Sequence, residues 1–146
     1  MRYLLRFLTC LSLAHVATAS AELPRVDLFA GMYRISAEVA GDFRSRATGL
    51  MHRNDMASNE GMIFIYPEKG IHCMWMRNTL IPLAVAFLDD DGVVLNVEEM
   101  DAQTDDNHCA RAPARFALEM NSGWFALKRI EPGMQIRGVD KLPSGQ

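Results

Sequence analysis

The segment from Cys73 to Leu88, CMWMRNTLIPLAVAFL, constrains the fold of this chain more than any other stretch. Two apolar, strand-like runs flank a short polar sequence, Arg77-Asn78-Thr79, and Pro82 follows it. Polar groups held between buried runs need hydrogen-bonding partners, so the residues packed around this segment must supply them. The pattern predicts a central hairpin whose bend, which carries the polar sequence, forms the floor of a binding site.

The first 21 residues have the pattern of a secretory signal peptide. Arg2 and Arg6 form a positive region, an apolar run follows, and small residues at 17–21 fit a cleavage site before Glu22. An uncleaved membrane anchor is the alternative, but the apolar run is too short to span a bilayer stably. We therefore expect residues 1–21 to be a signal peptide and residues 22–146 to be one domain, periplasmic or secreted, with no membrane span after signal removal.

The expected mature domain is acidic. The whole chain carries a formal net charge of −3, and loss of Arg2 and Arg6 with the leader, which contains no acidic residue, brings it to −5. Binding to nucleic acid depends on clustered Lys and Arg that contact phosphates. The charge therefore argues against a nucleic-acid partner and, for the same reason, against an anionic membrane surface.

Cysteine usage agrees with export. Once Cys10 leaves with the leader, Cys73 and Cys109 remain, and an even number in an oxidising compartment suggests a disulfide. A thiol pair that binds metal or transfers electrons is the alternative, but the chain has no Cys-x-x-Cys spacing. We predict a Cys73–Cys109 disulfide, which would also hold the long polar loop of residues 101–115.

Short apolar or alternating runs bounded by turn residues predict a β-rich domain. The predicted strands cover residues 32–40, 62–66, 71–76, 83–88, 93–100, 116–120 and 134–139, after a lead-in of residues 22–31. Two short helices are expected, one over residues 43–51 with Asp42 as its cap, and one within residues 121–129, which read as a turn into a short helix. Phe43, Ala47 and Leu50 fall on one face of the first helix. The fold class is therefore mostly β (α+β), a small curled antiparallel sheet or barrel of about seven strands with two short helices.

Four phrases, in their order and spacing, resemble the uncharacterised domain family DUF192. They are Gly49-Leu50-Met51-x-Arg53, Gly61-Met62-Ile63-Phe64, Trp75-Met76-Arg77-Asn78-Thr79-x-x-Pro82-Leu83 and Leu118-Glu119. The resemblance covers nearly the whole mature chain. It implies a compact, mostly β fold with short helices, in a family that includes many exported members, and it implies no reaction.

One position departs from the family pattern. The family usually has Asp after Pro-Leu, whereas this chain has Ala84 after Leu83. A carboxylate there would be a natural partner for a nearby Arg or for a ligand. Its absence leaves Arg77 or Arg53 without one candidate partner, and any function of that Asp in relatives would be altered or lost here.

The main candidate site surrounds the polar sequence. Tryptophan stacks on ligands, arginine forks onto oxyanions, and Asn and Thr fix orientation, so this set suits a small polar, anionic or carbohydrate-like ligand. The alternative is that Asn78 and Thr79 form a turn while Arg77 points to solvent. Glu119 is either the buried partner of an Arg or the carboxylate of a hydrolase-like enzyme. The candidate ligand-binding residues are Arg53, Trp75, Arg77, Asn78, Thr79 and Glu119.

A copper site is a further possibility. On a strand, His72, Met74 and Met76 face the same side, and thioether and imidazole ligands suit Cu(I). The alternative is that these methionines fill the core.

The chain has no Gly-x-Ser-x-Gly, no His-Glu-x-x-His and no phosphate-binding loop. We therefore predict a non-catalytic binding or accessory module without a cofactor, with a hydrolase-like enzyme using Glu119 and a periplasmic Cu(I)-binding protein as alternatives.

Overall fold

The computed structural model describes residues 22–146, so the predicted signal peptide lies outside the described residues. The strands are β1 (Arg25–Ala30), β2 (Tyr33–Ala40), β3 (Glu60–Gly70), β4 (Cys73–Met74), β5 (Leu83–Leu88), β6 (Val94–Met100), β7 (His108–Cys109), β8 (Ala114–Asn121) and β9 (Ile136–Arg137). The helices are α1 (Phe43–Thr48), α2 (Trp124–Lys128) and a 3-10 turn, η1 (Val139–Lys141). Within residues 22–146, no helix combines the length and apolar character that crossing a membrane requires.

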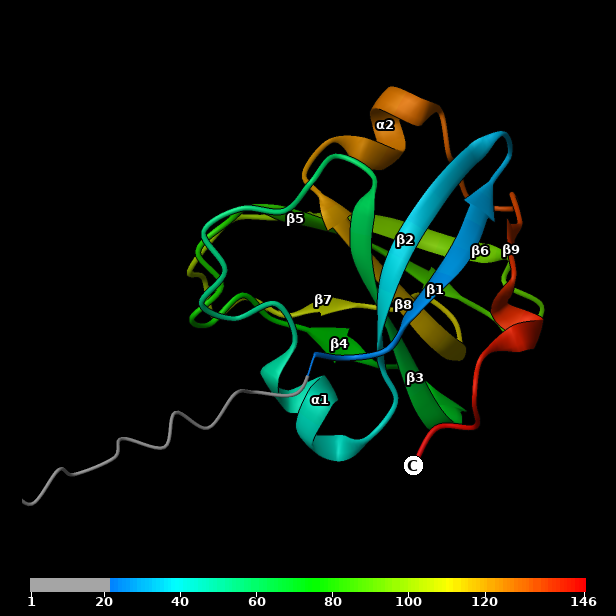
Figure 1. Cartoon of the computed structure of the whole chain (residues 1–146), viewed down its shortest axis with the longest axis horizontal. Coiled ribbons are helices and arrows are strands. Elements are labelled where there is room, and N and C mark those ends of the chain that lie inside the picture. The colour runs from blue at the N-terminus through cyan, green and yellow to red at the C-terminus, as the bar shows by residue number, and fades with distance from the viewer. Residues whose placement is uncertain (1–21) are drawn as a thin grey trace, which may run out of the picture.

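Seven strands form one curled sheet in the order β6-β5-β8-β3-β2-β1-β9, and β4 and β7 form a separate two-stranded sheet (Figure 1). Hydrogen bonds between Val94 at the start of β6 and residues 133 and 134, just before β9, link the two edges. The predicted curled sheet of about seven strands with two short helices is confirmed. The pairing of β2 with β3 is parallel, because the chain crosses over through α1 instead of turning back directly.

The sheet buries both of its faces. The first face packs against α2 and includes Leu28, Ile63 and Leu118. The second face includes Met62, Phe64 and Val85 and is covered by Leu50, Met74 and Met76. Since side chains alternate along a strand, Glu119 on β8 points to the second face, between its neighbours Leu118 and Met120 of the first. The second face is therefore the one that carries the candidate site.

The predicted central hairpin of residues 73–88 is wrong. β4 pairs with β7, whereas β5 pairs with β6 and β8. Between them, the backbone of the polar sequence bonds to the loop that follows β6: Met76 N–H donates to Thr104 O, and Thr79 O accepts from Gln103 N–H. The polar sequence thus joins two different sheets, because its backbone groups find their partners in a loop and not across a hairpin.

Other differences concern where strands begin and end. The predicted lead-in forms β1, which pairs with β2 from Arg25 opposite Glu38 to Ala30 opposite Tyr33. Pro24 and Gly31, which suggested a loop, only bound this strand. The strands predicted over residues 71–76 and 134–139 shrink to two residues each, β4 and β9.

Candidate functional site

A cleft of about 230 Å³ opens on the second face of the sheet, between α1 and the segment Cys73–Thr79. In Figure 1, α1 and β4 lie beside each other at one end of the sheet, and α2 lies at the other end. The cleft is lined by Phe43, Arg46, Ala47, Thr48, Gly49, Leu50 and Met51 on the α1 side, by Phe64, Tyr66 and Glu119 from the sheet, and by Cys73, Met74, Trp75 and Thr79 on the opposite side.

Helix α1 begins at the predicted cap. The Oδ1 atom of Asp42 accepts from Ser45 N–H at 2.9 Å, and Ser45 Oγ accepts from Asp42 N–H at 3.1 Å, which completes a capping box. Along the predicted apolar face, only Leu50 enters the core, whereas Phe43 is 80% exposed. The apolar face of α1 therefore forms one wall of the cleft and is not fully packed.

Arg46 fastens this wall to the rest of the domain. Its Nη1 donates to Gly41 O at 2.8 Å and to Ile65 O at 2.9 Å, and its Nη2 donates to Gln146 O at 2.7 Å. These bonds join α1 to β3 and to the C-terminal residue. Three donations to carbonyl oxygens occupy much of the guanidinium, although Arg46 also borders the cleft.

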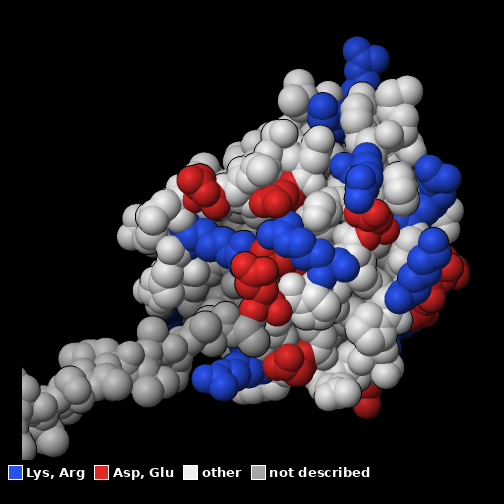
Figure 2. Space-filling view, viewed as in Figure 1, with Lys and Arg blue, Asp and Glu red and all other residues white. Residues whose placement is uncertain are grey.

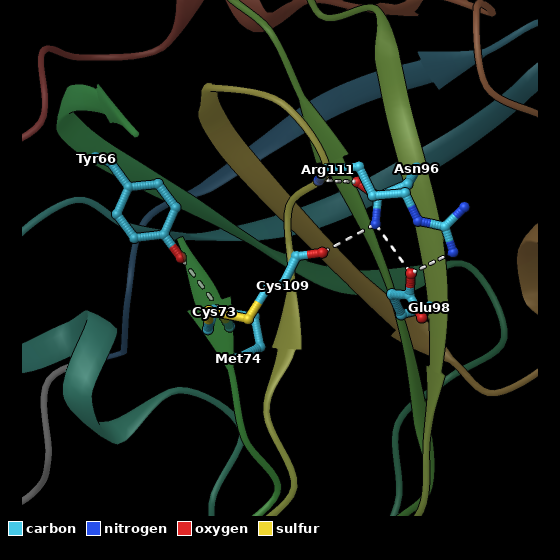
Figure 3. Close-up of a disulfide and its surroundings, with 7 residues drawn as sticks. All are labelled: Tyr66, Cys73, Met74, Asn96, Glu98, Cys109 and Arg111. Atoms are coloured by element: carbon cyan, nitrogen blue, oxygen red, sulfur yellow. Dashed lines mark hydrogen bonds and ion pairs between the residues drawn. A yellow bond between two sulfur atoms is a disulfide. The ribbon is translucent and has the colours of Figure 1, made fainter. Parts of the chain in front are cut away.

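The predicted disulfide fixes the opposite wall. Cys73 and Cys109 are bonded and lie opposite each other in the pairing of β4 with β7. Behind them, the buried amide of Asn96 on β6 donates to Cys109 O at 3.1 Å and to Glu98 Oε1 at 3.1 Å, and it accepts from Arg111 N–H at 3.0 Å (Figure 3). The disulfide therefore anchors β4 to the large sheet through β7.

Tyr66 joins β4 to the sheet from the other side. Its hydroxyl points toward β4 and donates to Met74 Sδ at 3.2 Å (Figure 3). The ring of His72 stacks on the Tyr66 ring with centroids 3.6 Å apart. Burial, followed by the nearby Glu119 charge, raises the pKa of Tyr66, so its hydroxyl remains protonated and available as a donor.

The three predicted copper ligands take part in packing. Met76 is fully buried in the second core, Met74 accepts the Tyr66 hydrogen bond, and His72 Nε2 lies 3.0 Å from Glu68 O. Among residues 22–146, no group of three or more His, Cys, Asp or Glu side chains could hold a metal ion. Methionine thioethers are additional possible ligands for Cu(I), so the copper site stays a prediction.

Only part of the segment Trp75–Thr79 lines the cleft. Trp75 and Thr79 line the cleft, and Arg77 and Asn78 are not among its lining residues. The Arg77 guanidinium lies 4.3 Å from the Trp75 ring centroid, and its Nε donates to Asp105 Oδ1 at 2.8 Å. Asn78 is exposed and forms a turn with a φ of 58°, as the alternative interpretation of this sequence expected.

Arg53 lies outside the cleft lining and is held by Glu38. Its two terminal nitrogens donate to the two oxygens of the buried Glu38 carboxylate at 2.7 and 2.5 Å, and Arg25 donates to the same carboxylate at 2.8 Å. Arg77 is paired with Asp105. The expectation that Glu119 is the buried partner of Arg53 or Arg77 is therefore wrong, because each guanidinium has another carboxylate within reach.

Glu119 stands at the base of the cleft without a partner among the described residues. It lies on β8 between Met62 of β3 and Val85 of β5, and it is 3% exposed. No hydrogen bond or charge contributes to its protonation, and burial alone raises its pKa to about 8. Within residues 22–146, every side-chain nitrogen or oxygen that is fully enclosed has a hydrogen-bond partner. Because the Glu119 carboxyl has none, its oxygens are not fully enclosed and keep contact with the cleft. A buried carboxyl in this state is typical of a functional site.

Ala84, where the family pattern usually has Asp, lies away from this cleft. It is fully buried in the first core, opposite Met120 of β8, whereas Glu119 faces the second core. The departure from the family pattern therefore leaves the lining of the cleft unchanged. Arg53 and Arg77, which this position might have served, pair with Glu38 and Asp105.

The sequence predicted one site that contains six residues. Three of them line the cleft: Trp75, Thr79 and Glu119. The other three, Arg53, Arg77 and Asn78, lie outside its lining. Sequence reasoning missed Arg46, Tyr66 and the cleft-lining role of Phe43. The available signal was weak: Phe43 belonged to a helical apolar stripe, and such stripes usually face a core.

Comparison with known proteins places this fold among uncharacterised relatives. The model of the DUF192 family, described as Uncharacterized ACR, matches residues 26–138. A crystal structure from Sinorhizobium meliloti 1021, described as a "putative transcription regulator", has a TM-score of 0.77 and 29% identity, covering 83% of this chain and 98% of that chain. One from Novosphingobium aromaticivorans DSM 12444, of unknown function, has a TM-score of 0.76 and 29% identity, covering 87% and 99%. No curated protein matches the chain.

Proposed function

We propose a function from the geometry of this chain, which belongs to the uncharacterised DUF192 family. It is a small binding or accessory module whose ligand occupies the cleft between α1 and Cys73–Thr79. The observation that carries the proposal is Glu119, a carboxyl that is 3% exposed, has no partner among the described residues and borders the cleft. A ligand that donates to this carboxyl would form its hydrogen bond in surroundings of low dielectric, where such a bond is stronger than in water.

The size and lining of the cleft support a small ligand. Its volume of about 230 Å³ lies below the roughly 300 Å³ at which pockets for drug-sized ligands begin. Apolar residues are the larger group in the lining, and the polar groups come from Arg46, Thr48, Tyr66, Thr79 and Glu119. This combination is typical of sites in which apolar contacts give affinity and a few polar groups fix orientation.

A polar ligand fits better than an anionic one. The arginines expected to hold an anion, Arg53 and Arg77, pair with Glu38 and Asp105 and do not line the cleft. Arg46 does line it but donates to three carbonyl oxygens. A carboxyl at the base would repel an anion once ionised, so we propose a polar ligand that is not anionic.

We propose that the module works in the periplasm or after secretion. The disulfide between Cys73 and Cys109 is compatible with an oxidising compartment, and the leader-like pattern of residues 1–21 points the same way. The charges do not favour a nucleic-acid partner, because Arg25, Arg53 and Arg77 pair with carboxylates. On the face in Figure 2, basic side chains lie next to acidic ones, as expected of a surface without a phosphate-binding role.

A hydrolase-like enzyme is the second candidate function. The raised pKa of Glu119, about 8, would suit a general acid near neutral pH. Hydrolysis of a glycosidic bond, however, usually needs a second carboxylate about 5–10 Å away. Glu119 is the one acidic residue among the described residues of the cleft lining. Turnover of a glycoside or ester panel that Glu119→Gln abolishes would favour the enzyme, and turnover unaffected by that change would reject this role.

A fragment titration with a matched pair of variants tests the binding function. Ala47 on α1 lines the cleft and is exposed, so Ala47→Trp should narrow the cleft without disturbing the core. Ala126→Trp places the same side chain on the exposed surface of α2 as a control.

Small polar fragments should shift the amide signals of Thr48, Leu50 and Thr79 in protein-detected NMR, with the wild type and Ala126→Trp alike. Ala47→Trp should abolish those shifts. If no fragment shifts these signals, or if Ala47→Trp binds fragments normally, the proposed function fails.

A further inference from the structure

Four aromatic side chains from three parts of the fold surround the cleft. Phe43 comes from α1, Phe64 and Tyr66 from β3, and Trp75 from the segment after β4. Phe43 is 80% exposed and Trp75 is 45% exposed, although large apolar side chains are usually better covered. Aromatic faces carry partial negative charge and attract cations, most strongly when water is excluded. The cleft therefore combines aromatic walls with an accessible opening.

The chain itself uses one of these rings to hold a cation. The Arg77 guanidinium lies 4.3 Å from the Trp75 ring centroid. Asp105 accepts from Arg77 Nε at 2.8 Å and keeps the guanidinium in place. This pair fixes the indole at the edge of the cleft and leaves Phe43, which has no such partner among the described residues, on the opposite wall.

Glu119 at the base of the cleft supplies the matching negative charge once it is ionised. Glu119 is acceptor-only when ionised, and neither a cation nor a donor of the described residues reaches it. Its cross-strand neighbours, Met62 and Val85, are apolar and cannot compensate the charge. A primary ammonium placed there would donate a charge-assisted hydrogen bond to the ionised carboxylate, and such bonds are stronger than those between neutral groups. A quaternary ammonium has no N–H and would be attracted by charge alone.

Arg46 is the one positive side chain among the described residues of the lining, so its effect on a cationic ligand matters. Its guanidinium donates to Gly41 O just before α1, to Ile65 O in β3 and to Gln146 O at the C-terminus. Arg46 is therefore held by backbone carbonyl oxygens and does not pair with Glu119. The Glu119 carboxyl is thus available to a group that enters the cleft from solution.

We infer that the cleft binds a small compound carrying an ammonium group, primary or quaternary, with that group beside Glu119 and the apolar part of the compound between Phe43 and Trp75. This inference rests on the proposed binding function and names the chemical class of its ligand. Such a compound fits both features of the cleft: its ammonium pairs with the ionised carboxylate, and its apolar part packs against the aromatic side chains.

Binding of such a compound should depend on pH. The groups that face Glu119 from the packed elements are Tyr66 on β3, whose pKa is raised by burial, and the Arg46 guanidinium on α1. Glu119 is therefore the group that titrates, with a pKa of about 8. A quaternary ammonium has no proton to lose, so its affinity should rise as pH rises through the Glu119 pKa and then level off.

The experiment compares n-pentylammonium, n-pentanol and n-pentanoate, which share one apolar chain, together with tetramethylammonium. Binding is followed by protein-detected NMR at pH values on both sides of the Glu119 pKa. We expect n-pentylammonium to bind at least about tenfold more tightly than n-pentanol, and n-pentanoate to bind most weakly. Glu119→Gln should remove the advantage of n-pentylammonium over n-pentanol. The pH dependence of tetramethylammonium binding in the wild type checks the same claim without a substitution.

The outcomes separate the inference from the proposed function. If n-pentanol or n-pentanoate binds in the cleft as tightly as n-pentylammonium, or if tetramethylammonium binding is independent of pH, the inference is overturned and the binding function stands. If the ammonium probes leave the cleft signals unchanged while neutral fragments shift them, the inference is again overturned alone. If neither group of compounds shifts them, both are overturned.

Discussion

The backbone N–H of His52 donates to the carbonyl oxygen of Asn78 at 2.9 Å, and both residues have left-handed backbones, with φ values of 63° and 58°. The first residue belongs to the turn after α1 and the second to the turn after β4. This single bond therefore joins the two walls of the cleft at one end. Asn tolerates a positive φ better than most residues, which explains its use at this point.

Asn78→Val should destabilise the domain, whereas Asn78→Gly should not. A β-branched side chain at a φ of 58° is strained, and the expected loss is ~1–2 kcal/mol in the free energy of unfolding. Glycine adopts this conformation without strain. Urea denaturation of the two variants measures the difference, and equal midpoints would show that the turn does not need this backbone conformation.

Gly61→Ala should be costly because β3 and β8 approach closely beside the cleft. A Cβ atom at this position would lie 2.4 Å from Glu119 O and 2.5 Å from Met120 Sδ. The backbone oxygen cannot move without shifting β8, so we expect a loss of about 2 kcal/mol. Gly41→Ala is the control, since its added atom would lie 3.8 Å from Val39. Similar unfolding midpoints for both variants would contradict this account of the packing.

Glu119 should make stability depend on pH. Its pKa rises from 4.5 to about 8 on folding, so between these values the folded state binds a proton that the unfolded state has released. Stability from this group is therefore full below about pH 4.5 and falls as pH rises toward 8, by at most ~1.4 kcal/mol per pH unit. Glu119→Gln should flatten this slope. Chemical denaturation across this range tests the sign, and identical slopes in both proteins would be inconsistent with a buried, unpaired carboxyl.

Removing the disulfide should weaken the wall of the cleft that contains β4. The bond closes a loop with a sequence separation of 36 residues, for which the chain-entropy model gives about 4 kcal/mol. We expect the double variant Cys73→Ser, Cys109→Ser to lose much of that stability. Its tryptophan fluorescence should change before global unfolding, because Trp75 borders the same cleft as Cys73, whereas Trp124 is buried in the first core. Asn96 should then be the main link from β7 to the sheet. Simultaneous fluorescence and circular dichroism transitions would argue against such local loosening.

Periodicity predicted most of the large sheet because its strands alternate strictly or are continuously apolar. β5, whose six residues are all buried, was recognisable from its apolar run and its Pro and Asp boundaries. β1 was missed because Pro24 and Gly31 resemble loop residues, although Leu28 and Ala30 are buried inward-facing positions. The expected hairpin of residues 73–88 failed because strand pairing is long-range: nothing in this segment specifies β7, and only the disulfide prediction pointed to it.

The sequence predicted the site residues whose position depends on their own neighbours in the chain. It did not predict which arginine pairs with which carboxylate. Trp75 and Thr79 reached the cleft, as a polar sequence between buried runs suggested. Arg53 and Arg77 did not, because Glu38 and Asp105 are better placed to pair with them than Glu119 is. Which carboxylate remains free is decided by the three-dimensional arrangement, and this determined the role of Glu119.

A direct titration of the Glu119 side chain tests the central claim that an unpaired, buried carboxyl forms the base of a ligand-binding cleft. The carboxyl carbon signal can be followed by NMR as a function of pH and assigned by its loss in Glu119→Gln. We predict a midpoint near the pKa of about 8, which falls when n-pentylammonium is added. A midpoint at the ordinary value of 4.5, unmoved by the amine, would contradict the account.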